Sequence, residues 1–396
     1  METSNNEHRA VSIALFTSLF AGQAALIAMA PVLTEAASDL DVSTVAAGQL
    51  RTLAGLTAGI TALLLGRLSA RVGLGRQLVG AALLLALGSL ASALAPSFAL
   101  LALAQLPVGV GVAILTTSGT LAAAEWVSPE MRTRTLSWAL VGQPAAVIVG
   151  MPLIGLVGQH SWRYGWLVLP FVAAVAAAAL IAPRHGGAPA AQPPARARVA
   201  FADPVLARWL LSELLVNSAW AGMLVYAGAL YAESYGSAPG QTGFLLAVAA
   251  GAYVAGNLSC RRLARYEASS VLIVLALVLA VAGFLFGVVR PDPLVSTAFL
   301  SVAAFASGAR TLVSSTFALA TAPALRPTVM RLRASTMQFG SFLGSIAGGL
   351  ALAVGGYRAF GATMGLVFLG AAAAIAQLPV PQRARTRRWA PALSGA

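Results

Sequence analysis

The chain has 396 residues, of which 59% are hydrophobic and only 9% are charged. A soluble protein of this length would carry about 25% charged residues, so the composition excludes an ordinary soluble domain and indicates a chain that crosses a membrane many times. The net charge is +13, but the arginines lie in short stretches between apolar runs. That distribution is a topology signal and argues against nucleic-acid binding.

The chain lacks the residues that several classes of enzyme need. All 25 basic residues are arginines, so neither a phosphate-binding P-loop lysine nor a Schiff-base lysine is present. The histidines His8, His160 and His185 fall in predicted tails or loops, and Cys260 is the single cysteine. We therefore expect no enzymatic activity, no cofactor and no metal site.

The first half of the chain contains six apolar runs, each near the 20 or so residues that a bilayer crossing requires. Residues 1–10 are predicted to form a polar tail, and an acidic connector (Glu35, Asp39, Asp41) follows the first run. The spans are predicted at 11–33, 42–65, 77–95, 97–124, 135–157 and 164–182.

A proline-rich stretch separates this half from the next. Residues 183–203 mix four prolines with alanine, glycine and arginine, so no buried face can be drawn through them and we expect a flexible linker. The second half repeats the layout and ends in a basic tail. Its spans are predicted at 206–232, 240–259, 269–289, 294–320, 334–354 and 359–379.

Arginine counts orient the predicted spans. Twelve crossings put both termini on one side, and the segments on that side hold twenty arginines, whereas the opposite connectors hold three, namely Arg163, Arg290 and Arg358. Positive residues accumulate on the cytoplasmic side. We therefore expect a multi-pass protein of a bacterial inner membrane with both termini and the linker in the cytoplasm.

Three loops and one helix carry a family resemblance. The turn at 66–76 resembles the loop between helices 2 and 3 of the major facilitator superfamily, with Ala70 in place of the usual aspartate. A fainter copy lies at 256–263, and a basic turn at 125–134 also fits the pattern. The loop residues that match are Gly66, Leu68, Arg71, Gly73 and Arg76.

The predicted fifth helix is similar to a glycine-proline motif of the superfamily's drug and sugar-efflux antiporters. The matching residues are Gly150, Pro152 and Gly155, with Gly142 nearer the start of the same predicted helix. Close glycines would let this helix pack against its partner, and the proline would bend it. Gln105 departs from the pattern, because those antiporters usually carry an arginine there.

The resemblance implies a fold and a mechanism. The fold is an all-α membrane protein with twelve transmembrane helices in two pseudo-symmetric six-helix bundles, residues 1–182 and 204–396. A substrate site would lie at mid-membrane, reached alternately from each side as the halves rock. Helices 1, 4, 7 and 10 would line it, and the 66–76 loop, with Arg71, would act as an inner gate.

Two charges inside the predicted spans are the sharpest site candidates, because a charge at mid-span costs at least about 2.5–3.5 kcal/mol. Arg310 lies about 15 Å from the cytoplasmic end of its helix and Glu213 about 10 Å, at 1.5 Å per residue. Arg310 would bind substrate or tie helices together. Glu213 would carry a coupling proton, since buried carboxylates can exchange protons near neutral pH, or form a permanent ion pair with Arg208 or Arg310. We predict that Glu213 and Arg310 pair in one state of the cycle.

Further polar and aromatic positions complete the candidate substrate site. Asn217 and Trp220 continue the stripe of Glu213 at helical spacing. Arg51 would reach the cavity or extend toward the outer interface, and uncharged polar residues are also common helix-packing contacts. The full set of expected substrate contacts is Arg310, Asn217, Trp220, Gln23, Gln105, Gln338 and Arg51.

Together these features predict a secondary active transporter that moves small organic solutes by alternating access, with proton-coupled efflux as the leading form. The alternatives are a solute importer of the same superfamily and a non-transporting membrane sensor or scaffold. The expected partners are a small-molecule substrate, the lipid bilayer and the proton gradient, and we expect a monomer.

Overall fold

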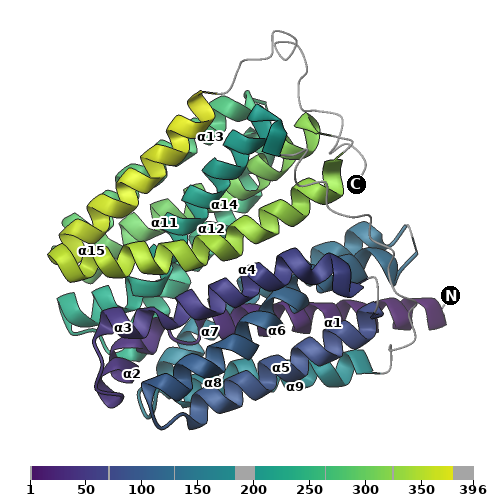
Figure 1. The fold of residues 1–396 in the computed structure, drawn as a ribbon, viewed down its shortest axis with the longest axis horizontal. Helices are drawn as coiled ribbons and strands as arrows, with labels where there is room; N and C mark the ends of the chain where they lie inside the picture. The colour runs from purple at the N-terminus through teal and green to yellow at the C-terminus, as the bar shows by residue number, and fades with distance from the viewer. Residues whose placement is uncertain are drawn as a thin grey trace. The chain divides into compact units, whose positions relative to one another are not determined.

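The computed structural model describes residues 2–69, 72–128, 130–182, 201–263, 265–322 and 325–377, which form helices and no strand (Figure 1). Within these ranges, ten helical segments are long and apolar enough to cross a membrane. Many large apolar side chains on them face outward: Leu87, Leu258 and Val354 are 62%, 76% and 87% exposed. Apolar faces of this extent are covered by lipid rather than water, so the chain is a multi-pass membrane protein.

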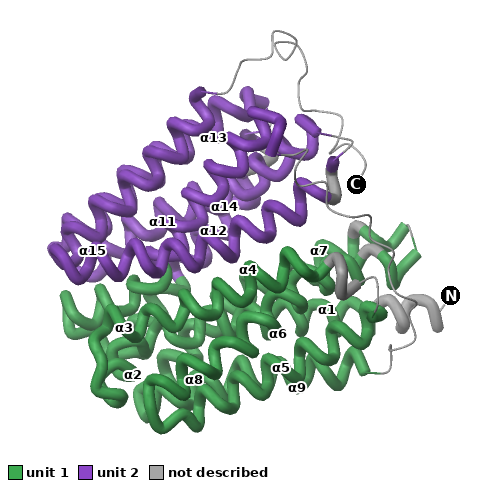
Figure 2. Tube along the Cα trace, viewed as in Figure 1, with its two compact units in different colours: residues 1–194, 224–247 green, residues 195–223, 248–396 purple. Residues whose placement is uncertain are grey.

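The helices pack into two compact units, coloured separately in Figure 2. Unit 1 comprises residues 1–194 and 224–247, and unit 2 comprises residues 195–223 and 248–396. The division passes through α11 (Pro204–Tyr235) and α12 (Pro239–Leu263). The segment 224–247, from the predicted C-terminal bundle, therefore packs with the N-terminal half of the sequence. Most of the predicted linker, residues 183–200, lies outside the described residues.

The remaining elements of unit 1 follow the predicted spans closely from the third span onward. They are α1 (Glu2–Ile27), η1 (Ala30–Val32), α2 (Leu33–Asp39), α3 (Thr44–Gly48), α4 (Leu50–Ser69), α5 (Leu74–Leu94), α6 (Phe98–Glu125), α7 (Arg132–Gly158), α8 (Tyr164–Trp166), η2 (Leu167–Phe171) and α9 (Val172–Ile181).

The candidate membrane span begins at Arg9, close to the predicted start at residue 11. The polar residues before it are helical, because α1 begins at Glu2 and no glycine or proline in residues 1–10 interrupts it. Helix α1 ends earlier than the predicted span: it stops at Ile27, and Pro31 follows at the start of η1. A further break at Gln49 divides the predicted second span into α3 and α4.

Three connectors of unit 1 meet at one end, as expected if all three lie on the same side of the membrane. The guanidinium of Arg163, between α7 and α8, pairs with the carboxylate of Asp39 at the end of α2. Its other nitrogen donates to the Ala95 carbonyl oxygen at 3.1 Å, beyond the end of α5. The indole of Trp162 adds a 3.0 Å hydrogen bond to Asp39. These contacts fix the loops between the helices of unit 1.

Unit 2 contains α13 (Ala268–Val288), α14 (Pro293–Thr321) and α15 (Arg326–Ala376), together with the first part of α11 and the rest of α12. The start of α14 shows why its boundary was predictable. Asp292 accepts hydrogen bonds from the backbone N–H groups of Leu294 and Val295 at 2.8 and 3.0 Å, and Pro293 occupies the first turn. An acidic cap followed by proline is a strong start signal.

Helix α15 corrects the prediction for the last two spans. It begins at Arg326 rather than at residue 334, so Arg331 and Arg333 lie inside a helix and not in an inner loop. The two predicted spans form one helical run with non-helical backbone at Gly355 and Gly356, and Gly356 has φ 60°. Glycine adopts that left-handed conformation without a Cβ clash, so the pair turns the chain between the two parts of α15.

Candidate functional site

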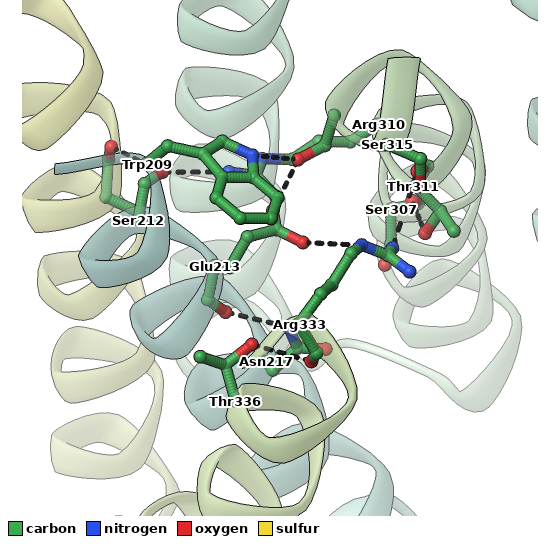
Figure 3. Close-up of polar contacts among 12 residues, drawn as sticks. Trp209, Ser212, Glu213, Asn217, Ser307, Arg310, Thr311, Ser315, Arg333 and Thr336 are labelled. Atoms are coloured by element: carbon green, nitrogen blue, oxygen red, sulfur yellow. Dashed lines mark hydrogen bonds and ion pairs between the residues drawn. The ribbon is translucent and has the colours of Figure 1, made fainter. Parts of the chain in front are cut away.

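The two charges singled out in the spans contact each other inside unit 2. Glu213 on α11 is 1% exposed and Arg310 on α14 is 2% exposed. The Arg310 guanidinium pairs with one Glu213 carboxylate oxygen (Figure 3). The predicted pairing is therefore present. A buried ion pair is stable only when geometry and further hydrogen bonds offset the desolvation of both charges.

A second arginine, missed in the sequence, also binds Glu213. Arg333 on α15 donates from Nε to the other carboxylate oxygen at 3.1 Å. One of its terminal nitrogens donates to the Thr311 carbonyl oxygen on α14 at 3.4 Å. The Arg333 side chain is 16% exposed, compared with 3% for Arg310. The pair thus becomes a cluster of two guanidiniums and one carboxylate drawn from three helices.

Hydroxyl and indole groups hold this cluster in place. Ser314 donates to the Glu213 oxygen at 2.8 Å and accepts from the buried indole of Trp209 at the same distance. Ser212 accepts from the Arg310 terminal nitrogen at 2.8 Å and donates to the Ala371 carbonyl oxygen at 2.9 Å. Each of these two serine hydroxyls therefore makes a second hydrogen bond, which fixes the orientation of the hydroxyl toward the charged group.

The cluster carries one more positive than negative charge. Among the described residues, the buried Nε atom of Arg310 has no hydrogen-bond partner, although buried polar groups nearly always have one. Both carboxylate oxygens of Glu213 are already engaged, because one accepts from Arg310 and Ser314 and the other accepts from Arg333. The arrangement can therefore accept a further anionic group without losing any of its own acceptors.

An aromatic pair lies next to the charged groups. Trp220 on α11 stacks on Tyr253 of α12, with ring centroids 6.3 Å apart and planes inclined by 17°. The Tyr253 hydroxyl lies 3.2 Å from the Thr311 hydroxyl, and Thr311 is the residue whose carbonyl accepts from Arg333. Both rings are half-buried. Thr311 thus links the aromatic pair to the charged cluster within unit 2.

The other predicted contacts of unit 2 lie close to the cluster or on the same helix. The Asn217 amide donates to the Glu213 backbone carbonyl at 2.7 Å, so its nitrogen serves α11 itself. Gln338 lies on α15, beyond Arg333, and is half-buried. Of the predicted substrate residues, Arg310 and Asn217 contact Glu213, whereas Trp220 contacts Tyr253 further along α11.

Three predicted substrate residues belong to unit 1. Gln105 on α6 is 3% exposed and donates to the Ser92 hydroxyl at 3.0 Å and to the Leu101 carbonyl at 3.3 Å, which are packing contacts with α5 and its own helix. Arg51 on α4 donates to the Leu26 carbonyl on α1 at 3.0 Å. Gln23 is half-buried on α1. The structure does not gather these three into one cluster.

The two family motifs occupy different parts of unit 1. Arg71 lies outside the described residues, while Gly73 precedes α5 and Arg76 is exposed in its first turn. On α7, a Cβ at Gly155 would lie 2.3 Å from the Pro239 carbonyl oxygen. The glycine therefore permits close backbone contact between α7 and the first turn of α12.

A local signal could have identified Arg333. Pro327 follows Arg326, and proline at the first helical position marks a helix start, which would have placed Arg333 about two turns inside the span. Trp209, Ser212 and Tyr253 carried no such signal. Their positions depend on how α11 and α12 rotate against their neighbours.

Comparison with known proteins agrees with this architecture. The sequence model of the Major Facilitator Superfamily matches residues 11–300. Among solved structures, a mutant of the nucleoside transporter NupG is 15% identical, with a TM-score of 0.71 over 92% of this chain and 98% of its own. A D-xylose-proton symporter is 13% identical, with a TM-score of 0.73 over 93% and 98% of the two chains.

A third structure, a bacterial homolog of the human lysosomal transporter Spinster, is 15% identical and has a TM-score of 0.68 over 94% of this chain and 95% of its own. At these identities the likeness establishes the fold alone. The family match covers residues 11–300, which is most of the chain. The chain belongs to the major facilitator superfamily.

Proposed function

We propose that the chain is a secondary active transporter that moves a small organic solute across the inner membrane by alternating access, with Glu213 coupling the movement to protons. The observation that carries the proposal is the cluster of Glu213, Arg310 and Arg333, which lies on helices of membrane-spanning length. Ionisable groups within spans are costly and are retained where they serve a substrate or ion pathway.

The proposed topology has twelve spans. The ten long apolar segments of the described residues count α15 once and do not include α4. Adding α4, and dividing α15 at Gly355 and Gly356, supports twelve crossings. Both termini and the 183–203 linker then lie in the cytoplasm, as the arginine bias indicates. Arg71 would contribute to an inner gate, and the transporter would act as a monomer.

The proposed coupling step is an exchange of partners. When Glu213 is ionised, it holds both guanidiniums. A proton on its carboxylate removes the negative charge, so Arg310 and Arg333 become available to the solute. Arg310 would be the main solute contact, with Asn217, Trp220 and Arg333 beside it. Gln338, Gln23, Gln105 and Arg51 would contribute only if the solute extends further.

Efflux is the leading direction. It is supported by the motif on α7, where Gly150, Pro152 and Gly155 resemble the drug and sugar-efflux antiporters. The close approach of Gly155 to Pro239 agrees with the packing role of that motif. In this form, an inward proton flow would drive the solute outward, which requires that proton and solute occupy the site in turn and not together as in the exchange of partners above.

Uptake is the second candidate, and the cluster itself favours it. A solute that needs the guanidiniums binds better once Glu213 is protonated. Because binding couplings are reciprocal, that solute also raises the affinity for the proton. The two would then travel in the same direction.

The test uses purified protein in liposomes that enclose a pH-sensitive dye. Compounds selected by resistance of a hypersensitive host are added across an imposed pH gradient, and proton and solute fluxes are recorded together. Opposite fluxes support efflux, and parallel fluxes support uptake. The Glu213→Gln protein should exchange solute at equal concentrations on both sides but should not concentrate it.

Glu267→Gln is the matched control. This exposed carboxylate lies before α13, and hydrogen bonds from Ser269 and Ser270 lower its pKa. Because it lies outside the spans, its replacement should leave coupled transport unchanged. Uphill transport by the Glu213→Gln protein at the wild-type level would refute the proton role.

A further inference from the structure

The charge count of the cluster identifies the kind of solute. Two guanidiniums face a single carboxylate in unit 2. Guanidinium groups remain protonated at all physiological pH values, so the cluster carries an excess positive charge while Glu213 is ionised. An uncompensated charge in a low-dielectric site is unfavourable. The site is therefore stabilised by any anion that can reach it.

Unused hydrogen-bond donors show where such an anion would bind. Arg310 Nε is buried and has no hydrogen-bond partner in the part of the chain that the structure describes, and the Arg310 side chain is only 3% exposed. Arg333 uses Nε and one terminal nitrogen. A planar guanidinium offers five N–H donors, so Arg333 keeps donors for a carboxylate, which guanidinium binds in a two-pronged geometry.

Access to the cluster comes through Arg333. Its side chain is 16% exposed although it lies on a membrane-spanning helix. A partly exposed charge at this depth is tolerated where it faces a water-filled cavity rather than lipid. Arg333 therefore provides the point at which a solute from water first meets the cluster, with Arg310 and Glu213 behind it.

The aromatic pair defines the rest of the solute. Thr311 links the two features, because its carbonyl accepts from Arg333 and its hydroxyl contacts Tyr253. Tyr253 and Trp220 present half-buried, nearly parallel rings beside that link. A flat apolar group packs well on such rings.

We infer that the cluster is a binding site for an organic carboxylate that carries a planar ring, with the carboxylate on Arg333 and Arg310 and the ring against Trp220 and Tyr253. The inference rests on the proposed function in taking this cluster as the solute site. Binding and transport are therefore measured separately.

The binding test uses four probes on detergent-purified protein: 2-naphthoate, benzoate, acetate and the neutral isostere benzamide. Thermal stabilisation gives the affinity of each probe. Benzoate and 2-naphthoate should bind at least tenfold more tightly than benzamide and acetate. Equal stabilisation by benzamide and benzoate would refute the inference that the site requires a carboxylate. Equal stabilisation by acetate and benzoate would refute the inference that it requires a ring.

Three variants connect binding to the cluster. Arg333→Gln should weaken benzoate binding at least tenfold, while Arg331→Gln, a neighbour on α15, should leave it unchanged. Glu213→Gln should tighten benzoate binding, because it removes the carboxylate that competes for the same guanidiniums. A merely structural role for Glu213 predicts the opposite. Weaker benzoate binding in a folded Glu213→Gln protein would overturn the inference.

The liposome assay then separates the two proposals. Benzoate binding that follows these rules, without carboxylate flux in liposomes, would support the anion site and refute transport through it. Solute flux that is insensitive to Arg333→Gln and to competing benzoate would support transport and refute the anion site.

Discussion

The charge balance of the cluster predicts an unequal response to removing its members. Arg333→Gln or Arg310→Gln leaves one guanidinium opposite Glu213, which is a neutral pair. Glu213→Gln leaves two guanidiniums and no carboxylate, with Arg310 almost fully buried. The carboxylate variant should therefore lose far more stability than either arginine variant.

The magnitudes follow from burial and contacts. Breaking a buried pair so that a charge is left without its partner costs about 3–5 kcal/mol, which applies to Glu213→Gln. Arg310→Gln loses its bonds to Glu213 and Ser212 but keeps the charge balanced, so about 1–3 kcal/mol is expected. Arg333 is partly exposed, and its replacement should cost about 1 kcal/mol.

Reversible unfolding in mixed micelles titrated with a denaturing detergent measures these differences, with tryptophan fluorescence as the signal. Glu267→Gln provides the reference and should stay within about 0.5 kcal/mol of wild type. The double variant Glu213→Gln/Arg310→Gln should be more stable than Glu213→Gln alone, since it restores part of the balance. If Arg333→Gln is as destabilising as Glu213→Gln, or if the double variant is the less stable, the charge-balance reasoning is wrong.

Two further predictions concern helix packing. A Cβ at Gly344 on α15 would lie 1.9 Å from the Ser218 carbonyl oxygen on α11. Gly344→Ala should therefore force the two helices apart and lower the free energy of unfolding by about 1–3 kcal/mol in the same assay. As the control, a Cβ at Gly251 would meet nothing within 4 Å, so Gly251→Ala should be neutral or stabilising by up to about 1 kcal/mol. In unit 1, the Tyr226 hydroxyl accepts from the Gln49 amide at 3.0 Å and donates to the Val45 carbonyl at 3.4 Å. Tyr226→Phe should therefore lower the free energy of unfolding by about 1 kcal/mol and speed amide hydrogen exchange in α3. Tyr266→Phe, at an exposed position, should do neither. Unchanged hydrogen exchange in α3 of the Tyr226→Phe protein would show that this contact does not hold the helix.

The extent of most helices could be predicted because apolar runs end at recognisable residues. The starts of α13 and α14 lie within one residue of the predicted positions, and at α14 the aspartate-proline pair explains why. Prediction of the helix limits failed where a polar stretch was assumed to lie outside a helix. Residues 2–10 are helical although polar, and the arginines before residue 334 were assigned to a connector although they continue α15.

The centre of the site was predictable from depth alone. Glu213 and Arg310 lie within one helical turn of the same level by residue count, and a buried carboxylate and guanidinium each need a partner. Arg333 was missed because basic residues near a span end were assigned to the cytoplasm. Tyr253 was missed for another reason: α12 is apolar on most sides, so its sequence does not reveal which face meets Trp220.

The excess charge of the cluster has an electrical consequence. A unit charge that crosses the full membrane field changes in energy by about 2.3 kcal/mol per 100 mV. Two arginines opposite an ionised glutamate give the empty carrier one excess positive charge at this site. In the proposed exchange of partners, the loaded carrier has Glu213 protonated and a monoanion bound, so it carries the same excess charge. Membrane voltage would then act equally on the loaded and the empty step, a full cycle would move no net charge, and the final solute gradient would not depend on potential.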